Sequence, residues 1–223
     1  MIKITSPIIY QRLQRKDSPA GRKYITPNGG EALPSVTEIL SKTGDKTALI
    51  EWRKRVGDAE ANRISKESTG LGTLVHKHVE NYILGEERPG GTNEVRVLAK
   101  KLSDNIIEKG LVDVSEIWAM EQPLYYPGLY AGTADLIGVF KGNPAIMDHK
   151  TSKEVKKEQW VQDYYMQLAA YGLAHNELYG TDIKSGAIFM TARNGDYKTF
   201  VIDGLKWQEA CDNWSRRVDA YYS

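Results

Sequence analysis

The sequence predicts an α/β fold in which a central mixed β-sheet is flanked by helices and preceded by a helical N-terminal extension. Apolar residues recur at helical spacing through most of the first half, up to about residue 109. Three strand-like runs then follow one another between residues 112 and 151, and a long helical pattern and another strand come after them. The resulting core order is αβββαβ, which is typical of a sheet covered by helices.

Composition indicates one soluble domain without a global nucleic-acid signal. The 223 residues include 30 Lys+Arg and 29 Asp+Glu, a net charge of +1, so any DNA-binding surface has to be local. Cys211 is the single cysteine, which excludes an intrachain disulfide and a multi-cysteine zinc or iron–sulfur site. The first residues resemble neither a signal nor a transit peptide, and no apolar run is long enough for a membrane. We therefore expect a cytoplasmic protein with no membrane partner.

The N-terminal extension is expected over residues 1–69. A tight turn is predicted at residues 27–30, and a short helix should begin after Ser35, whose hydroxyl can cap the amide of Glu38. Asp45 can cap a longer helix that continues to about Ile64. The outer face of that helix is the best basic patch of the chain and the expected DNA-binding surface. Its predicted contacts are Arg53, Lys54, Arg55 and Arg63.

The core is expected over residues 70–203, within a single domain. Gly70 and Gly72 should break the helical pattern before a second helix over 73–84, and another helix is predicted over 94–109. Strands are predicted over 112–126, 130–140 and 144–151, separated by turns at 127–128 and 141–143. A helix over 157–179 and strands over 184–191 and 197–202 complete the core. Residues 204–223 should form a C-terminal helix.

Two acidic residues and a lysine mark the candidate chemistry. Asp135 lies within one strand and Asp148 and Lys150 in the next, so antiparallel pairing can bring the carboxylates together. Two carboxylates and a backbone carbonyl, for which His149 is the candidate, are the oxygen ligands that a divalent metal prefers. Lys150, on the same strand face as Asp148, can orient or deprotonate an attacking water. The alternative is an ordinary surface ion pair, but the apolar residues around these strands favour a functional site.

Four motifs in order strengthen this interpretation. They are Gly72-Thr73-Leu74-Val75-His76, Gly132-Thr133-Ala134-Asp135, Asp148-His149-Lys150 and Gln167-Leu168-Ala169-Ala170-Tyr171. The series resembles RecB-like nucleases of the PD-(D/E)XK superfamily. Residues 34–37, Trp52-Arg53 and 72–80 are similar to the group of mitochondrial genome maintenance exonucleases and their phage relatives. The resemblance covers about residues 24–171 and implies a restriction-endonuclease-like core.

The resemblance also implies individual roles. His76, Asp135 and Asp148 would be metal ligands and Lys150 the catalytic lysine, with Gln167 and Tyr171 supporting the site. From the residues alone, His76 is as compatible with a surface or core histidine, and Tyr171 with a packed ring beside a solvated Gln167. Glu80, one helical turn after His76, could orient its imidazole. Glu121 is either a ligand of a second metal or a structural charge.

These observations lead to an expected activity. We expect a DNA exonuclease that uses Mg²⁺ or Mn²⁺, without an iron–sulfur cluster, and prefers single-stranded DNA with free ends. Tyr164 belongs to a group of tyrosines near the site that could stack on bases. We further expect a role in DNA replication, repair or recombination, with a partner protein from such a pathway. We also expect a phage or bacterial source. The alternatives are a lambda-exonuclease-type enzyme that resects duplex ends and a DNA-binding subunit that does not cut.

Overall fold

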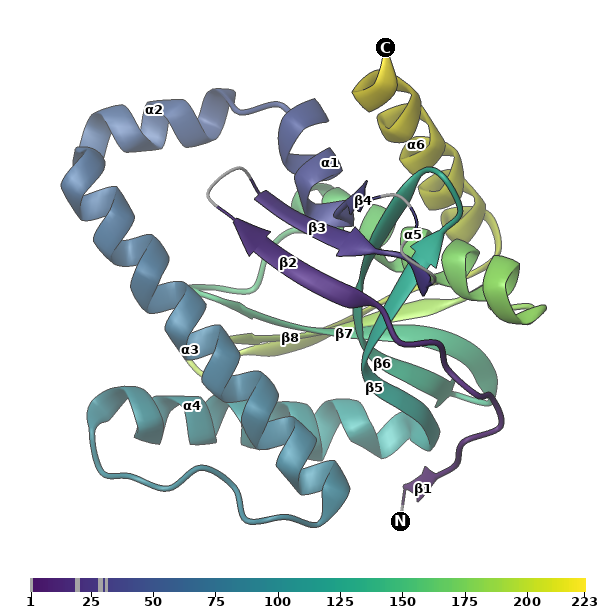
Figure 1. Cartoon of the computed structure of the whole chain (residues 1–223). Helices are drawn as coiled ribbons and strands as arrows, with labels where there is room; N and C mark the ends of the chain where they lie inside the picture. The colour runs from purple at the N-terminus through teal and green to yellow at the C-terminus, as the bar shows by residue number, and fades with distance from the viewer. Residues whose placement is uncertain (1, 19–20, 28–29, 31) are drawn as a thin grey trace.

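A six-stranded mixed sheet forms the centre of the computed structural model, which describes residues 2–18, 21–27, 30 and 32–223 (Figure 1). The strand order is β1-β5-β6-β7-β8-β9; β5, β6 and β7 form an antiparallel meander, β8 is parallel to β7, and β9 is antiparallel to β8. The strands are β1 (Lys3–Ile4), β5 (Val114–Tyr126), β6 (Tyr130–Phe140), β7 (Asn143–Ser152), β8 (Gly186–Ala192) and β9 (Tyr197–Ile202). The predicted α/β class and mixed central sheet are confirmed.

Helices cover both faces of this sheet. Alternate residues of the strands point to opposite sides, so Ile137 and Ile146 pack in the core under α5 (Gln162–Tyr179) and α6 (Gly204–Tyr222). Their sequence neighbours Leu136 and Met147 pack in a second core under α3 (Asp58–Leu84) and α4 (Glu94–Asn105). A π-helical turn (Ile106–Gly110) and a short 3-10 turn (Leu111–Asp113) connect α4 to the sheet. Both faces are therefore apolar, as the uninterrupted apolar runs in β6 and β7 require.

The predicted helix break at Gly70 and Gly72 is wrong. Both glycines lie inside α3, and the chain bends instead at Gly57, between α2 (Thr47–Val56) and α3, where φ is 84°. A glycine costs a helix only about 1 kcal/mol, which tertiary packing easily offsets. A side chain on Gly72 would begin 3.6 Å from the Thr151 hydroxyl, in ordinary contact, so α3 runs close to β7 at this point.

The N-terminal extension contains a small sheet as well as helices. Strands β2 (Gln14–Ser18), β3 (Gly21–Ile25) and β4 (Ala32–Pro34) are antiparallel and lead into α1 (Val36–Thr43), which Ser35 caps as predicted by accepting from the Glu38 amide at 3.1 Å. Tyr24 joins this sheet to β6 through a 3.1 Å hydrogen bond with Thr133. The predicted turn at 27–30 includes residues 28 and 29, which lie outside the described residues. Within the described ranges no helix is both long and apolar enough to span a bilayer.

Candidate active site

The register of the meander aligns three carboxylates across neighbouring strands. Met120 and Gln122 of β5 pair with Leu136 and Ala134 of β6, which places Glu121 opposite Asp135. On the other side, the ladder between β6 and β7 ends at the pair Leu136 and Met147, one residue before Asp135 and Asp148 would face each other. There Asp135 Oδ2 instead accepts the His149 amide at 2.9 Å, so the side chain of Asp135 bridges the two strands.

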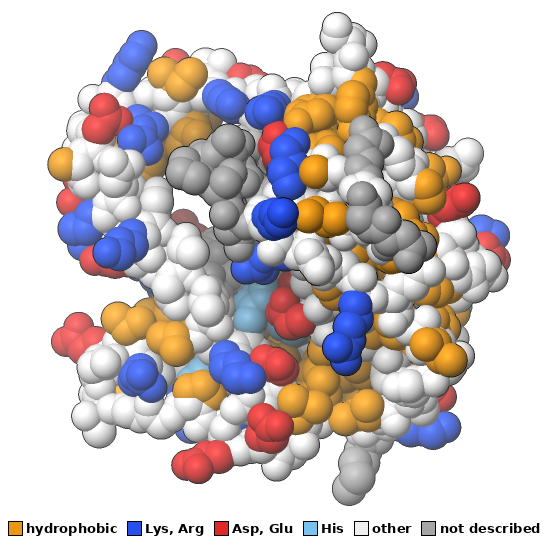
Figure 2. All heavy atoms as spheres, viewed as in Figure 1, with side chains coloured by type: hydrophobic (Ala, Val, Ile, Leu, Met, Phe, Trp, Pro, Cys, Tyr) orange, Lys and Arg blue, Asp and Glu red, His pale blue; other side chains and the backbone are white. Residues whose placement is uncertain are grey.

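His76 reaches the end of the β6–β7 ladder from α3 and completes a possible cation site. Its Nδ1 lies 3.5 Å from Asp135 Oδ2 and 3.7 Å from Glu121 Oε1. Together the three side chains offer ligand atoms that all lie within 4.8 Å of one another. Figure 2 shows histidine and acidic side chains next to each other in the hollow at the middle of this face. One imidazole nitrogen and two carboxylates form a donor set that can hold a divalent metal ion.

The hydrogen bond made by His76 Nε2 determines which ring nitrogen is available to bind a metal. His76 Nε2 lies 3.0 Å from the carbonyl oxygen of His149, so it carries the hydrogen and donates to that oxygen. This leaves Nδ1, which faces the carboxylates, to act as a metal ligand in the neutral ring. The His149 carbonyl, predicted as a metal ligand, here accepts a hydrogen bond that orients His76.

Electrostatics at the site favour a bound cation. Burial acts against charge on His76, but Asp135, Glu121 and Asp148 outweigh it and raise its pKa to about 9. Asp148 is 3% exposed, and burial raises its pKa although Lys150 opposes the shift. Lys150 Nζ lies 2.5 Å from Asp148 Oδ2, whereas Asp148 Oδ1 has no hydrogen-bond partner in the described part of the chain. A buried carboxylate oxygen without a donor fits a site that a metal would complete.

Backbone conformation sets Glu121 apart from its neighbours in β5. Its φ is 46°, in the left-handed region that a residue with a side chain rarely adopts. Such strain costs on the order of 1–3 kcal/mol and is concentrated at functional sites. Glu121 is half-exposed and stands in one cluster with His76 and Asp135, so its carboxylate does not mark a separate, second-metal position.

Gln167 and Tyr171 meet as their spacing suggests. Gln167 Nε2 donates to the Tyr171 hydroxyl at 3.3 Å, one helical turn away on α5. Both side chains are buried, so Gln167 is not solvated. Burial raises the pKa of Tyr171, and the carboxylates of Asp148 and Asp135 add to the shift, which keeps the phenol protonated. The pair lies on α5, on the face of the sheet that this helix covers.

Glu80 and the basic helix differ from expectation. Glu80 lines the same hollow as His76, but its carboxylate pairs with Lys77 at 3.0 Å and both nitrogens of His76 face other groups.

The predicted DNA-binding cations are only partly free. Arg53 donates to Asp58 and Asn62, and Arg63 pairs with Glu60 and Glu67. Two of the four predicted cationic contacts are thus engaged by neighbouring side chains. The other two, Lys54 and Arg55, are exposed on α2.

Tyr164 lies beside the catalytic candidates and reveals a residue that the sequence did not single out. The Lys150 ammonium is 5.1 Å from the centre of the Tyr164 ring, and the Lys156 ammonium is 4.7 Å from the same point. Lys156 is one of three lysines within residues 153–157, and the other two are Lys153 and Lys157. Its position in sequence gives no signal that separates it from the other two.

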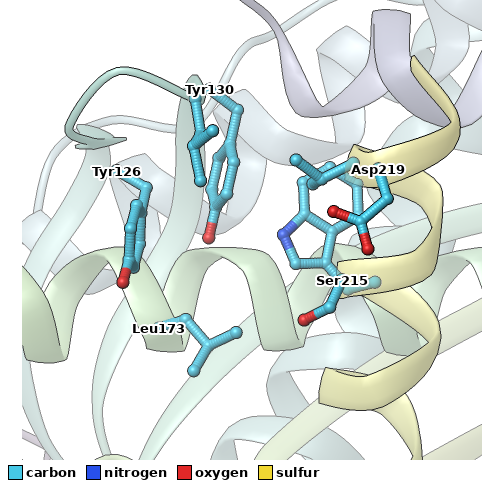
Figure 3. Close-up of a pocket in the computed structure, with 8 residues that line it drawn as sticks. Tyr126, Tyr130, Leu173, Ser215 and Asp219 are labelled. Atoms are coloured by element: carbon cyan, nitrogen blue, oxygen red, sulfur yellow. The ribbon is translucent and has the colours of Figure 1, made fainter. Parts of the chain in front are cut away.

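A separate cavity of about 270 Å³ lies between the β5–β6 hairpin and α6 (Figure 3). Tyr126 and Tyr130 of the hairpin stand on one side of it, and Ser215 and Asp219 of α6 on the other. None of the predicted site residues lines this cavity. The predicted site residues therefore gather at the small hollow next to His76 and not in this cavity.

Comparisons with known proteins give one relative in sequence and a distant likeness in structure. The mouse mitochondrial genome maintenance exonuclease 1 is 24% identical over 177 residues, which are 74% of this chain and 51% of the relative. The chain is related in sequence to an exonuclease. It spans about half the length of that relative. No family model matches. A crystal structure from Eubacterium rectale, provisionally named an exonuclease, aligns with a TM-score of 0.45 and 16% identity over 66% of each chain.

Proposed function

We propose that the protein is a metal-dependent DNA exonuclease of the PD-(D/E)XK type. The observation that carries the proposal is the convergence of His76, Glu121 and Asp135 beside the buried Asp148 and its ion-pair partner Lys150. An isolated surface ion pair would not have a histidine, a strained glutamate and a further aspartate gathered next to it where β5, β6 and β7 adjoin. The sequence similarity to an exonuclease supports the same class of reaction.

The side chains present would divide the work of phosphodiester hydrolysis. His76 Nδ1, Glu121 and Asp135 would hold Mg²⁺ or Mn²⁺, with Asp148 adjoining, and the bound cation would neutralise charge on the phosphate. Burial lowers the pKa of Lys150, but Asp148 and Asp135 outweigh it and raise the pKa. Lys150 would orient or deprotonate the attacking water and stabilise negative charge as that charge develops. Gln167 and Tyr171 support the carboxylates from behind.

The surroundings of the site suit a flexible single strand of DNA. Helices α1, α2 and the first part of α3 form an open frame beside the small sheet (Figure 1), and a strand led past this frame would pass the exposed Lys54 and Arg55. Trp160 is 59% exposed on the short 3-10 turn (Glu158–Trp160) between α5 and β7, the strand that carries Asp148 and Lys150. An exposed ring is a stacking surface for an unpaired base. We infer that single strands with free ends are the preferred substrate.

End-labelled substrates test this function. Linear single strands, linear duplexes and closed single-stranded circles are incubated with the protein and Mn²⁺, beside a Lys150→Ala preparation that reports contaminating nuclease. We expect degradation of the linear single strand, slower attack on the duplex and survival of the circle. Efficient cutting of the circle by the wild-type protein alone would establish an endonuclease. Preferred digestion of the duplex would favour an end-resecting enzyme, and DNA binding without cutting a non-catalytic subunit.

A further inference from the structure

We propose that Lys156 is a second phosphate-binding lysine of the catalytic centre, held beside Lys150 by the ring of Tyr164. The inference rests on the nuclease function proposed above and adds to it the residue that binds a DNA phosphate next to the scissile one. Its basis is the position of Lys156, its charge balance and the way its segment is attached to the sheet.

The ring of Tyr164 brings the two lysines together. Lys156 Nζ donates to the Tyr164 hydroxyl at 2.7 Å and lies 4.7 Å from the ring centre, while Lys150 Nζ lies 5.1 Å from the same centre. The phenol oxygen accepts from the Lys156 ammonium, and the Lys150 ammonium lies within cation–π distance of the ring, so one tyrosine side chain contacts both lysines. The result is two like charges that share one aromatic partner, next to the carboxylate of Asp148.

The charges of the two lysines are balanced differently. Lys150 is paired with Asp148. For Lys156, the described residues offer no carboxylate at ion-pair distance, although its side chain is half-buried. A partly desolvated ammonium without a counterion gains from any anion that reaches it. In a DNA-cleaving site that anion is a backbone phosphate, which would relieve the repulsion between the two lysines as it binds.

The segment that carries Lys156 is fixed to the sheet. The Lys156 amide donates to the sulfur of Met190 at 3.4 Å, and Met190 on β8 is the register partner of Lys150 on β7. The Ser152 hydroxyl donates to the Glu154 carbonyl at 2.7 Å and closes the turn after β7. Lys156 therefore holds its place relative to Lys150 before DNA arrives, so that little ordering cost remains at binding.

The salt dependence of DNA binding tests this role. A fluorescein-labelled single-stranded oligonucleotide is titrated with protein at several KCl concentrations in excess chelator, which prevents cutting, for wild type, Lys156→Ala, Lys156→Arg and Lys184→Ala. Lys184→Ala makes the same charge change at an exposed lysine that pairs with Asp182. Loss of one phosphate contact should lower the slope of log K against log salt by about 0.7 in Lys156→Ala only. The KM of cleavage should rise in the same variant.

The possible outcomes separate this inference from the proposed function. A lower slope and a raised KM in Lys156→Ala support a phosphate contact if Lys156→Arg and Lys184→Ala keep the wild-type slope and the wild-type KM. Wild-type slope and KM in Lys156→Ala, in a preparation that cuts DNA, overturn the inference and leave the nuclease function standing. Equal changes in Lys156→Ala and Lys184→Ala also overturn it, because they show an effect of net charge alone. A wild-type protein that neither binds nor cuts DNA refutes the proposed function itself.

Discussion

The substitution Gly132→Ala probes how closely α5 packs on the site-bearing strand. A methyl group on Gly132 of β6 would lie 2.6 Å from Tyr171 Cε1 and 2.9 Å from its hydroxyl oxygen. Ordinary carbon contacts begin near 3.5 Å, so the ring would have to retreat by roughly an ångström. Tyr171 is 3% exposed and accepts from Gln167, which leaves it little room to move. We therefore expect both a loss of stability and a disturbance of the Gln167–Tyr171 pair.

Overpacking of this kind costs about 1–3 kcal/mol. For a domain of this size the melting temperature should fall by roughly 2–12 °C, at about 2–4 °C per kcal/mol, which thermal denaturation followed by circular dichroism can resolve. In a Tyr171→Ala background the same change should cost little, because the clashing ring is gone. Gly70→Ala is the matched control: nothing lies within 4 Å of the added atom in α3, so that variant should be unchanged or slightly more stable. Additive costs of Gly132→Ala and Tyr171→Ala would refute the reasoning.

Three further changes address the histidines and Glu121. The pKa of His76 in the folded protein, about 9, lies above its ordinary value near 6.5, so His76 contributes stability fully below pH 6.5 and loses it as pH rises towards 9. Urea denaturation in chelator should show this decline in wild type and not in His76→Gln; parallel pH profiles would contradict the assigned contacts. Glu121→Gln should weaken Mn²⁺ binding in calorimetry, and wild-type affinity would exclude Glu121 as a ligand. His78 is fully buried, and neither ring nitrogen has a hydrogen-bond partner among the described residues, so His78→Leu should melt at the same or a higher temperature; a drop of several degrees would show a partner.

Sequence reasoning reached the meander and its catalytic candidates because their signals are local. Turn residues at 127–128 and 141–143 separate apolar runs, and a hairpin between such runs necessarily brings Asp135 near Asp148. The bend at Gly57 was missed because a glycine has the same local signal inside a helix as at its end. In α3 the packing against β7 and α4 decides which glycines are helical.

Glu121 and Lys156 depend on information that no short stretch of sequence contains. The position of Glu121 follows from the register between β5 and β6 and from a backbone angle that its residue type does not favour. Lys156 differs from Lys153 and Lys157 only through its contacts with Tyr164 and Met190, which lie on separate elements. Likewise, Arg53 and Arg63 resemble a DNA-binding face in sequence, whereas in the structure Arg53 pairs with Asp58 at the start of α3 and Arg63 pairs with Glu60 within α3.

In the proposed mechanism, a cation held by His76, Glu121 and Asp135 works with Lys150 to cut DNA. Single-turnover hydrolysis of end-labelled single-stranded DNA tests it most directly when combined with calorimetric Mn²⁺ binding on the same preparations. Wild type should cut with Mg²⁺ or Mn²⁺ and stop in excess chelator; Asp135→Asn and Asp148→Asn should be inactive, Asp135→Asn with weakened metal binding. Lys150→Ala should keep its metal affinity while its rate falls steeply. Robust cutting in excess chelator, or a wild-type rate in Lys150→Ala, would contradict the account.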